Sequence, residues 1–497
     1  MIHLRDIHYS YPGTEWVLRG IDLTIEDGEY VVVYGANGSG KSTLGYLFNG
    51  LIPHFLGGTL KGCVTVNGTD TQKSTPADLF LHVGLVLQNA DAQLFNSTVE
   101  DEIAFGLESL GLPGREIDKR IREISEALHI ENLLDRSPAT LSGGEKRLAA
   151  IASVLCLDPP LLLLDEPCAS LDWEAASRVR NVLKQIHERG KNVVVLEQRT
   201  GAFLQDTTRC LVAKQGKILF DGTPKAAREI LNREHLVPHY SIPRKNKPLE
   251  KRPILAVRDL SCRIEKKEIL KDISFEIRTG ETVAIIGKNG SGKTTLIKHL
   301  NGLLRPTKGE VIFQGETIRA KPPSEMAANV GVSFQNPNDQ FFKERVKDEL
   351  LVGLRMREKR KDGWFEDICD IFDLHDLLDR SPYRLSEGEK KRVALSSIFA
   401  MQPRLLVLDE PTLGQDGRFR ESLAALLEGL EDRGFTTLIA THDLGFAEAV
   451  ANRWIVLHEG RVVADGAPQD VWRNEELIRL GALKRPAEVV TAGPWEY

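Results

Sequence analysis

The chain has 497 residues, more than one ordinary hydrophobic core holds, so two or more domains are expected. Hydrophobic residues make up 41% and charged residues 27%, which is typical of a folded globular protein, and the net charge of -6 disfavours a protein that mainly grips nucleic acid. We expect no membrane-spanning helix, because no apolar stretch approaches ~20 residues, and no signal peptide, because the first residues have no apolar core. The six cysteines form no C-x-x-C pair, which fits a reducing compartment and disfavours a zinc site.

The first half of the chain alternates predicted strands and helices. It opens with the β-rich segments LRDIHYSY and GIDLTIE, then the apolar strand YVVVY, a glycine loop, and the segment GCVTVNG. A charged helical stretch covers about residues 101–129. The runs LLLL at Leu161 and VVVL at Val193 are wholly apolar, as in strands that are buried on both faces. This order predicts an α/β domain with a largely parallel sheet.

The second half repeats the motifs of the first. GANGSGKST returns as GKNGSGKTT, VLRGIDLTIEDGE as ILKDISFEIRTGE, RSPATLSGGEKR as RSPYRLSEGEKK, and LLLLDEP as LLVLDEP. The repeat is too long for a solenoid, so it indicates a duplicated domain. We expect a first domain at residues 1–235, a proline-rich and basic linker at 236–252, a second domain at 253–483, and a C-terminal extension at 484–497.

Each half carries the phosphate-loop pattern G-x-x-x-x-G-K-[ST] between an apolar strand and a helix. Glycines let backbone N–H groups approach a polyphosphate, and the helix adds its positive N-terminal end. Lys41 and Lys293 would reach the β- and γ-phosphates, and the hydroxyls of Ser42 and Thr294 would join a Mg²⁺ shell. The residues expected to bind nucleotide are Gly35, Asn37, Gly38, Ser39, Gly40, Lys41, Ser42 and Thr43 in the first loop, and Gly287, Asn289, Gly290, Ser291, Gly292, Lys293, Thr294 and Thr295 in the second.

Two adjacent carboxylates end a later apolar strand in each half. These pairs are Asp165-Glu166 and Asp409-Glu410. The first acid of a pair can hold Mg²⁺ through water, and the second can orient or deprotonate an attacking water molecule. A single acid at this place could equally be a solvated strand end. The pairing with a phosphate loop, found twice, favours the catalytic interpretation.

These residues resemble the ATP-binding-cassette (ABC) family over nearly the whole chain. LSGGE at 141–145 matches the signature of the family and LSEGE at 385–389 is a close variant. The resemblance implies two tandem ABC-type P-loop ATPase domains that use ATP and Mg²⁺. Each domain would be α/β, with a mainly parallel sheet core, an antiparallel β subdomain and a helical subdomain. It also implies that Gln88 and Gln335 are lid glutamines at the metal, that Asp172 and Asp416 lie in D-loops, and that His442 is the switch histidine at the γ-phosphate.

The resemblance further implies that the two halves of one chain pair head to tail and bury each ATP between them. Each nucleotide would touch the phosphate loop of one half and the signature of the other, which makes the pairing effectively intramolecular. The first composite site would combine Lys41, Ser42, Gln88, Asp165 and Glu166 with Ser386 and Gly388; the second would combine Lys293, Thr294, Gln335, Asp409, Glu410 and His442 with Ser142, Gly143 and Gly144.

The two composite sites differ in sequence. Gln198 stands where the switch histidine belongs in the first site, and Glu387 replaces a glycine of the signature that would complete it. Glutamine cannot become a cation, and a carboxylate near a γ-phosphate is unfavourable. Tyr11 offers the first site an aromatic ring for adenine, whereas the segment 263–264 offers the second none. We predict that the second site is the main hydrolytic site; the alternative is that both sites work.

The lid segments narrow the expected role. QNADAQLF and QNPNDQFF, the helices VEDEIAFG and VKDELLVG, and the segment NGLIPHFLGG are similar to the ATPases of energy-coupling-factor (ECF) importers, which take up vitamins or cobalt and nickel ions. This resemblance implies an integral membrane coupling subunit and a separate substrate-binding membrane subunit as partners, no nucleic acid, and a peripheral position at the cytoplasmic face of the membrane. The second glutamine and the aromatic residue of each lid segment could also simply pack the lid.

Three other functions fit parts of the sequence. Tandem ATPases of sugar-type importers have a similar length but different lid and signature regions. A soluble twin-cassette ATPase that acts on ribosomes or nucleic acid usually shows a long charged helical linker, a basic surface or cysteine metal clusters, and the sequence shows none of these. A regulatory scaffold without hydrolysis is disfavoured by the intact Asp409, Glu410 and His442.

Overall fold

The computed structural model describes residues 1–198, 203–240, 253–265, 267–334, 336–355 and 363–483. These residues divide into two compact units, Met1–Pro238 and a second that begins at His239, and each unit is described by itself. The lid glutamine Gln335, most of the expected linker and the expected C-terminal extension lie outside the described residues. Within the described parts of the chain, no helix combines the length and the apolar character needed to cross a bilayer.

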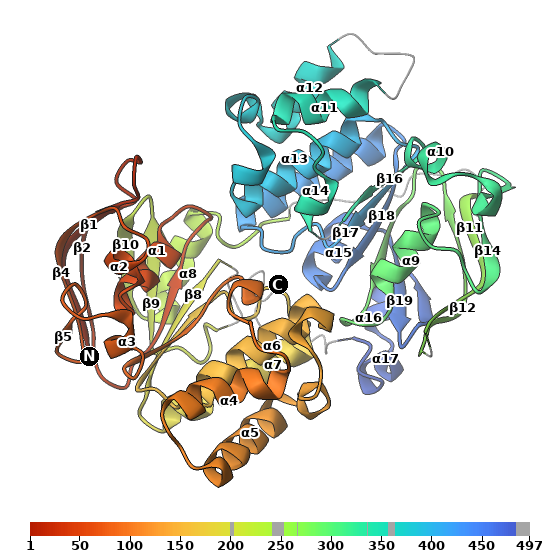
Figure 1. The fold of residues 1–497 in the computed structure, drawn as a ribbon. Coiled ribbons are helices and arrows are strands. Elements are labelled where there is room, and N and C mark those ends of the chain that lie inside the picture. The colour runs from red at the N-terminus through yellow and green to blue at the C-terminus, as the bar shows by residue number, and fades with distance from the viewer. Residues whose placement is uncertain (199–202, 241–252, 266, 335, 356–362, 484–497) are drawn as a thin grey trace. The chain divides into compact units, whose positions relative to one another are not determined.

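The first unit contains two sheets (Figure 1). The antiparallel sheet has the order β2-β1-β4-β5, from β1 (Ile2–Ser10), β2 (Leu18–Ile25), β4 (Thr59–Val66) and β5 (Thr69–Asp70). The second sheet has the order β10-β9-β3-β8-β7-β6, from β3 (Tyr30–Tyr34), β6 (Val83–Val86), β7 (Leu161–Asp165), β8 (Asn192–Glu197), β9 (Arg209–Lys214) and β10 (Lys217–Gly222). All its neighbouring strands run parallel except the edge pair β9 and β10.

The parallel sheet of the first unit is buried on both faces, as its apolar strands predict. Along β3, Tyr30, Val32 and Tyr34 pack into one core and Val31 and Val33 into another. The first core is filled mainly by helices and the second by α1 and the antiparallel sheet. The helices are α1 (Lys41–Phe48), α2 (Leu51–His54), α3 (Pro76–Leu79), α4 (Val99–Ser109), α5 (Gly114–Leu128), α6 (Gly143–Leu155), α7 (Trp173–Glu188) and α8 (Pro224–Arg233).

The charged stretch expected near residues 101–129 forms two helices rather than one. Helix α4 ends at Ser109, and Pro113 stands immediately before α5. A residue before proline is disfavoured in the helical conformation, so the chain breaks there. In Figure 1, α4, α5, α6 and α7 lie together on the side of the parallel sheet away from β1, β2 and β4. They form the predicted helical subdomain.

The second unit repeats this architecture. Its antiparallel sheet has the order β12-β11-β14-β15 and its larger sheet the order β16-β17-β18-β13-β19-β20, again parallel except at the edge pair β19 and β20. The strands are β11 (Pro253–Ile264), β12 (Lys267–Arg278), β13 (Thr282–Ile286), β14 (Lys308–Phe313), β15 (Glu316–Thr317), β16 (Val330–Ser333), β17 (Leu405–Asp409), β18 (Thr436–Thr441), β19 (Arg453–His458) and β20 (Arg461–Gly466). The helices are α9 (Lys293–Leu300), α10 (Pro323–Ala327), α11 (Val346–Arg355), α12 (Trp364–Phe372), α13 (Glu387–Ala400), α14 (Gly417–Asp432), α15 (Leu444–Val450), α16 (Pro468–Trp472) and α17 (Glu475–Arg479).

A tight hairpin holds the phosphate loop of the first unit in place. Gln215 and Gly216 join β9 to β10 with positive φ angles of 48° and 77°, and the N–H of Gly216 donates to the carbonyl of Ser39 at 3.1 Å. A Cβ at Gly216 would lie 2.0 Å from the carbonyl oxygen of Val17. Only glycine therefore fits between the loop and β2.

We expect Gly216→Ala to lower the melting temperature of the protein well beyond a matched control. The control is Gly190→Ala, because Gly190 has a similar φ of 85° but open space around its Cβ position. The control loses about 1 kcal/mol from conformation alone, whereas Gly216→Ala adds a clash worth about 1–3 kcal/mol more. Scanning calorimetry measures both, and equal losses would show that the backbone contact does not constrain this hairpin.

Candidate functional site

The first phosphate loop joins β3 to α1. Gly40 caps the helix with a φ of 96°, and the ammonium group of Lys41 donates to the carbonyls of Gly35 at 2.6 Å and Ala36 at 3.0 Å. The lysine thus lies over its own loop, next to the helix N-terminus. A cation and an open helix end at one point form an anion-binding site.

The second phosphate loop has the same geometry between β13 and α9. Lys293 Nζ donates to the carbonyls of Gly287 at 2.7 Å and Lys288 at 3.2 Å. A Cβ at Gly287 would lie 2.3 Å from the carbonyl oxygen of Leu457, so this close approach requires glycine. The structure therefore brings the sequence-predicted loop residues of each half together around one lysine.

The first acid of each carboxylate pair is buried at the carboxyl end of its strand. Neither oxygen of Asp165 has a hydrogen-bond partner among the described residues, and neither does Oδ1 of Asp409. Oδ2 of Asp409 accepts from the Thr294 hydroxyl at 2.8 Å. Burial raises the pKa of Asp165 and of Asp409 to about 6. A buried carboxylate oxygen without a hydrogen-bond partner is suited to bind a cation.

The donor set fits Mg²⁺ bound together with phosphates. Mg²⁺ is usually held by one or two carboxylates, a hydroxyl, water and substrate phosphate rather than by a cage of protein ligands. Asp409 and Thr294 supply two such oxygens at one point. No group of three or more histidine, cysteine or acidic residues that could hold a metal occurs in the described ranges.

The second acid of each pair adopts a strained backbone conformation. Glu166 has a φ of 47° and Glu410 a φ of 48°, in the left-handed region that few side chains occupy. Their N–H groups donate to the carbonyls of Leu196 at 2.9 Å and Ala440 at 2.8 Å, which fixes them to the neighbouring strand. Both halves therefore hold this glutamate in the same backbone conformation.

The switch positions contact these glutamates differently in the two halves. The Gln198 amide donates to Oε2 of Glu166 at 2.8 Å, and both side chains are buried. Nδ1 of His442 lies 2.9 Å from Oε2 of Glu410. Sequence spacing therefore identified the correct neighbours in both halves.

Glu410 is held as an anion by two basic neighbours. Burial alone would raise its pKa, but His442 and then Lys293, whose Nζ lies 3.5 Å from Oε1, outweigh burial and lower the pKa to about 2. Glu410 can therefore accept a hydrogen bond from a water molecule across the whole physiological pH range.

Buried cations that follow the signatures hold the lid segments. Arg147 on α6 donates to the carbonyl of Leu87 at 2.5 Å and also to that of Gln88, and Lys391 on α13 donates to the carbonyl of Phe334 at 3.3 Å. The sequence analysis missed both cations. Their one signal was the recurring basic residue at the same place after each signature, KR and KK.

The second glutamine and the aromatic residue of each lid segment have separate roles. Gln93 accepts from the N–H of Leu87 at 3.0 Å, and Gln340 accepts from that of Phe334 at 2.9 Å, so both glutamines pack the lid. Phe95 and Phe342 instead remain 68% and 77% exposed. The packing interpretation is correct for the glutamines and does not account for the aromatic residues.

The signature serines cap the helices that follow them. The hydroxyl of Ser142 accepts from the N–H of Glu145 at 3.3 Å, and that of Ser386 accepts from the N–H of Glu389 at 3.4 Å. In return, each glutamate carboxylate accepts a hydrogen bond from the serine N–H. Gly143, Gly144 and Gly388 lie in the first turns of these helices. Each signature is thus a preformed helix N-terminus.

The remaining predicted residues lie near the phosphate loops or begin helices. The hydroxyl of Tyr11 lies 3.0 Å from that of Thr43 on α1. Asp172 and Asp416 accept from backbone N–H groups at 3.0 Å and so cap α7 and α14. The pairing of one half's signature with the other half's phosphate loop stays a prediction, as do the roles of Gln335 and of the Glu387 side chain.

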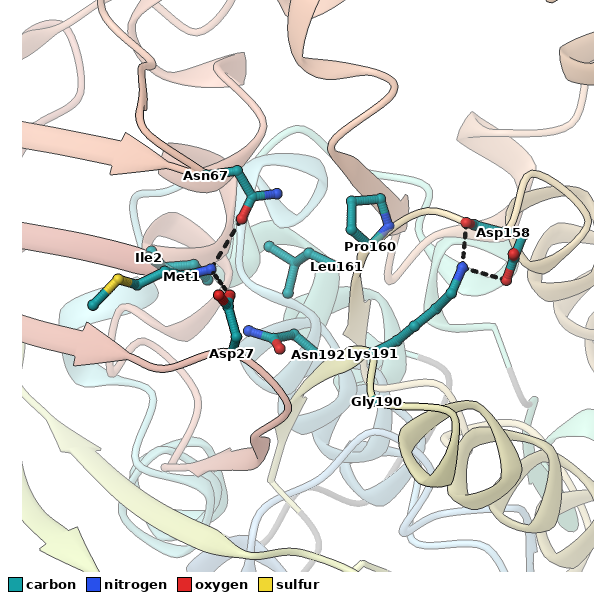
Figure 2. Close-up of a pocket in the computed structure, with 10 residues that line it drawn as sticks. All are labelled: Met1, Ile2, Asp27, Asn67, Asp158, Pro160, Leu161, Gly190, Lys191 and Asn192. Carbon is teal, nitrogen blue, oxygen red and sulfur yellow. Dashed lines mark hydrogen bonds and ion pairs between the residues drawn. The ribbon is translucent and has the colours of Figure 1, made fainter.

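A separate pocket in the first unit lies at the amino-terminal ends of the parallel strands. It has a volume of about 510 Å³ and is lined by Leu161 at the start of β7 and Asn192 at the start of β8 (Figure 2). The phosphate loop follows the other end of the neighbouring strand β3, so this pocket is not the nucleotide site. Figure 2 also shows the Met1 amine bonded to Asp27 and Asn67 at its mouth.

Two phosphate loops with buried acid pairs on mainly parallel sheets define a twin P-loop ATPase. Residues 18–169 and 270–413 match the ABC transporter family, and the chain belongs to that family as a tandem ABC ATPase. It is 34% identical to a "Putative ABC transporter ATP-binding protein" of Caldanaerobacter subterraneus subsp. tengcongensis, over 95% of this chain and 92% of the relative. It is 35% identical to one of Methanosarcina mazei, over 94% and 95%.

A solved structure shares the fold. It is the archaeal ribosome recycling factor aABCE1, in complex with the archaeal ribosomal stalk protein aP1. The TM-score is 0.68 over 96% of this chain and 92% of that one, with 21% sequence identity. At this identity the likeness concerns the fold alone.

We expect Asp409→Asn to stabilise the metal-free protein while it abolishes the thermal stabilisation by Mg²⁺ and ATP. The folded-state pKa of about 6 lies above the unfolded value of 3.8, so the ionised carboxylate costs up to about 3 kcal/mol above pH 6 and nothing below about pH 4. The gain in melting temperature should therefore be full at pH 7.5 and shrink as the pH falls below 6. The exposed Asp376→Asn is the control, and a pH-independent gain would contradict the assignment.

Proposed function

We propose that the chain is the ATP-hydrolysing energy-coupling subunit of an ECF-type membrane importer for vitamins or transition-metal ions. The observation that carries this proposal is the exposed aromatic residue in each lid segment, next to an otherwise complete ATPase site. Its partners would be an integral membrane coupling subunit and a separate membrane subunit that binds the cargo. The protein would lie peripherally at the cytoplasmic face of the membrane and would bind no nucleic acid.

The aromatic residues of the lids supply the contact surface for the coupling subunit. In the first unit Phe95 packs edge to face on Phe105 of α4 with ring centroids 5.0 Å apart, and both rings stay exposed. Phe342 repeats the exposed position in the second unit. Exposed aromatic pairs contribute much apolar area at a small cost in side-chain entropy, which suits a helical segment at a membrane surface. Arg147 ties the lid of the first unit to the helix of its signature, so docking there would be felt at the ATP site.

ATP hydrolysis at the second site would use residues from both halves. Lys293 and the N–H groups of its loop would hold the β- and γ-phosphates. Asp409 and Thr294 would hold Mg²⁺, which screens the phosphate charge when it is bound. Glu410, anionic at neutral pH, would orient the attacking water and receive its proton. Ser142, Gly143 and Gly144 of the other half would complete the site, so that loss of the γ-phosphate releases the pairing.

The second composite site would carry most of the hydrolysis. His442 beside Glu410 can donate to the γ-phosphate and can become a cation. Gln198 in the first half has an amide that is engaged by Glu166 and that never carries charge. The first site would therefore turn over slowly or mostly hold nucleotide.

We expect Lys293→Ala and Glu410→Gln each to reduce ATPase activity at least a hundredfold. The matched variants Lys41→Ala and Glu166→Gln should retain more than half of the wild-type rate, because the first site contributes little turnover. Steady-state phosphate release with Mg–ATP measures all four. Equal losses from the two pairs would end the asymmetry proposal and leave a symmetric ATPase.

We expect Phe95→Asp and Phe342→Asp to reduce co-purification with detergent-solubilised membrane proteins at least fivefold. Leu480→Asp is the matched control, because Leu480 is 48% exposed and lies at the C-terminal end of α17 rather than in a lid segment. A mass-spectrometric inventory of the complex would name the partners. Unchanged recovery of membrane proteins, or recovery with ribosomes or nucleic acid, would contradict the importer role; recovery with a sugar-type permease would overturn the ECF subtype.

A further inference from the structure

A buried cluster lies directly behind the switch histidine of the second unit. Arg420 on α14 forms an ion pair with Asp443, the residue after His442, and both side chains are buried. The Thr412 hydroxyl donates to Oδ2 of Asp443 at 3.1 Å, and Oδ1 of Asp443 accepts from the N–H of Phe446 at 3.1 Å. We call Arg420, Asp443 and Thr412 the latch cluster.

The latch cluster is connected to the catalytic carboxylate by a continuous chain of hydrogen bonds. The N–H of Asp443 donates to the Thr441 hydroxyl at 3.0 Å, which donates to Oε2 of Glu410 at 3.1 Å. The same oxygen is approached by the N–H of His442 at 3.4 Å and by its Nδ1 at 2.9 Å. The loop that carries His442 is thus fixed by Glu410 on one side and by Arg420 on the other.

The first residues of the second unit pack beside the cluster. The ring of Tyr240 packs against that of Phe446 at 6.2 Å, and the N–H of His239 donates to the Glu421 carboxylate at 2.6 Å. Asp443 and then Tyr240 keep the pKa of Arg420 raised despite burial. Tyr240 therefore lies beside the cluster and packs against Phe446 of α15.

The first half lacks this arrangement at every position. By the motif alignment, Thr412 corresponds to Cys168, Arg420 to Ala176, and Asp443 to Arg199, which lies outside the described residues. The half that has a switch histidine has the cluster, and the half that has a glutamine does not. Fold stability alone does not explain this difference, because both halves build the same sheet and the same helix.

We propose that Arg420, beside Tyr240, is a positioning residue that holds His442 in register with Glu410. The proposal rests on the proposed role of His442 at the second ATP site, and it extends that site to a helix that begins at the D-loop residue Asp416. Arg420 bonds Asp443 rather than the catalytic carboxylate. It acts by removing the rotational freedom of the loop that carries the histidine, which a buried ion pair with several hydrogen bonds can do.

The test measures the position of His442 without relying on activity. Diethyl pyrocarbonate modifies accessible imidazoles, and mass spectrometry of the full-length chain at pH 7.5 gives a rate for each histidine. His442 is 9% exposed, whereas His299 of the same unit is completely buried and reports on unfolding. We expect Arg420→Met to speed modification of His442 at least fivefold and to leave His299 protected. Tyr240→Ala, which leaves no charge unpaired, should give a smaller rise, and Arg420→Lys should restore most of the protection.

Kinetics supply the second readout. We expect Arg420→Met to lower kcat at least tenfold with the KM for Mg–ATP within twofold, and to cause no further loss in a His442→Ala background. An unchanged rate at His442, equal acceleration at His299, or a full further loss in that background would overturn the proposal. If His442→Ala itself left the ATPase intact, the proposed second-site role would fail, while the modification rates would still decide whether Arg420 positions the histidine.

Discussion

The structure depends on keeping two adjacent carboxylates buried at the end of one strand in each half. Burial in a low dielectric disfavours the ionised form, and a neighbouring like charge adds to the penalty. In the second unit the two acids meet this penalty in different ways. Asp409 has a raised pKa and one unpartnered oxygen that suits a cation, whereas Glu410 lies beside Lys293 and His442 and stays ionised. The remaining features of the site, including the lysine laid over its loop and the strained backbone of the glutamate, follow from this division.

The parallel sheet is what makes that division possible. Because its strands run parallel, their carboxyl ends lie at the same edge, where the phosphate loop, the acid pair and the switch position all meet. Other parts of the chain surround this edge. The helical subdomain positions the lid and signature, and the β9–β10 hairpin supports the first loop from behind.

The sequence predicted this edge well, because each of its motifs is a short contiguous pattern that recurs in both halves. The glycine loops, the acid pairs, the apolar strands and the neighbours Gln198 and His442 all lie where expected. Contacts between distant segments were not predictable. Nothing local distinguishes the packed Gln93 from the exposed Phe95, and a lone Arg420 in an amphipathic helix looks like a solvated charge. The charged stretch at residues 101–129 forms two helices, α4 and α5, because Pro113 lies between them.

The duplication turns one half into a control for the other. Features that recur in both halves, such as the left-handed glutamate and the signature capping box, answer constraints that every copy of the site must meet. Features found in one half answer something that this half alone must do. A glutamine amide bonded to Glu166 is held by that bond and needs little else, whereas an imidazole that must reach both a carboxylate and a phosphate needs its backbone fixed. The proposed role of Arg420 accounts for this difference, because the half with a glutamine has neither the histidine nor the buried ion pair behind it.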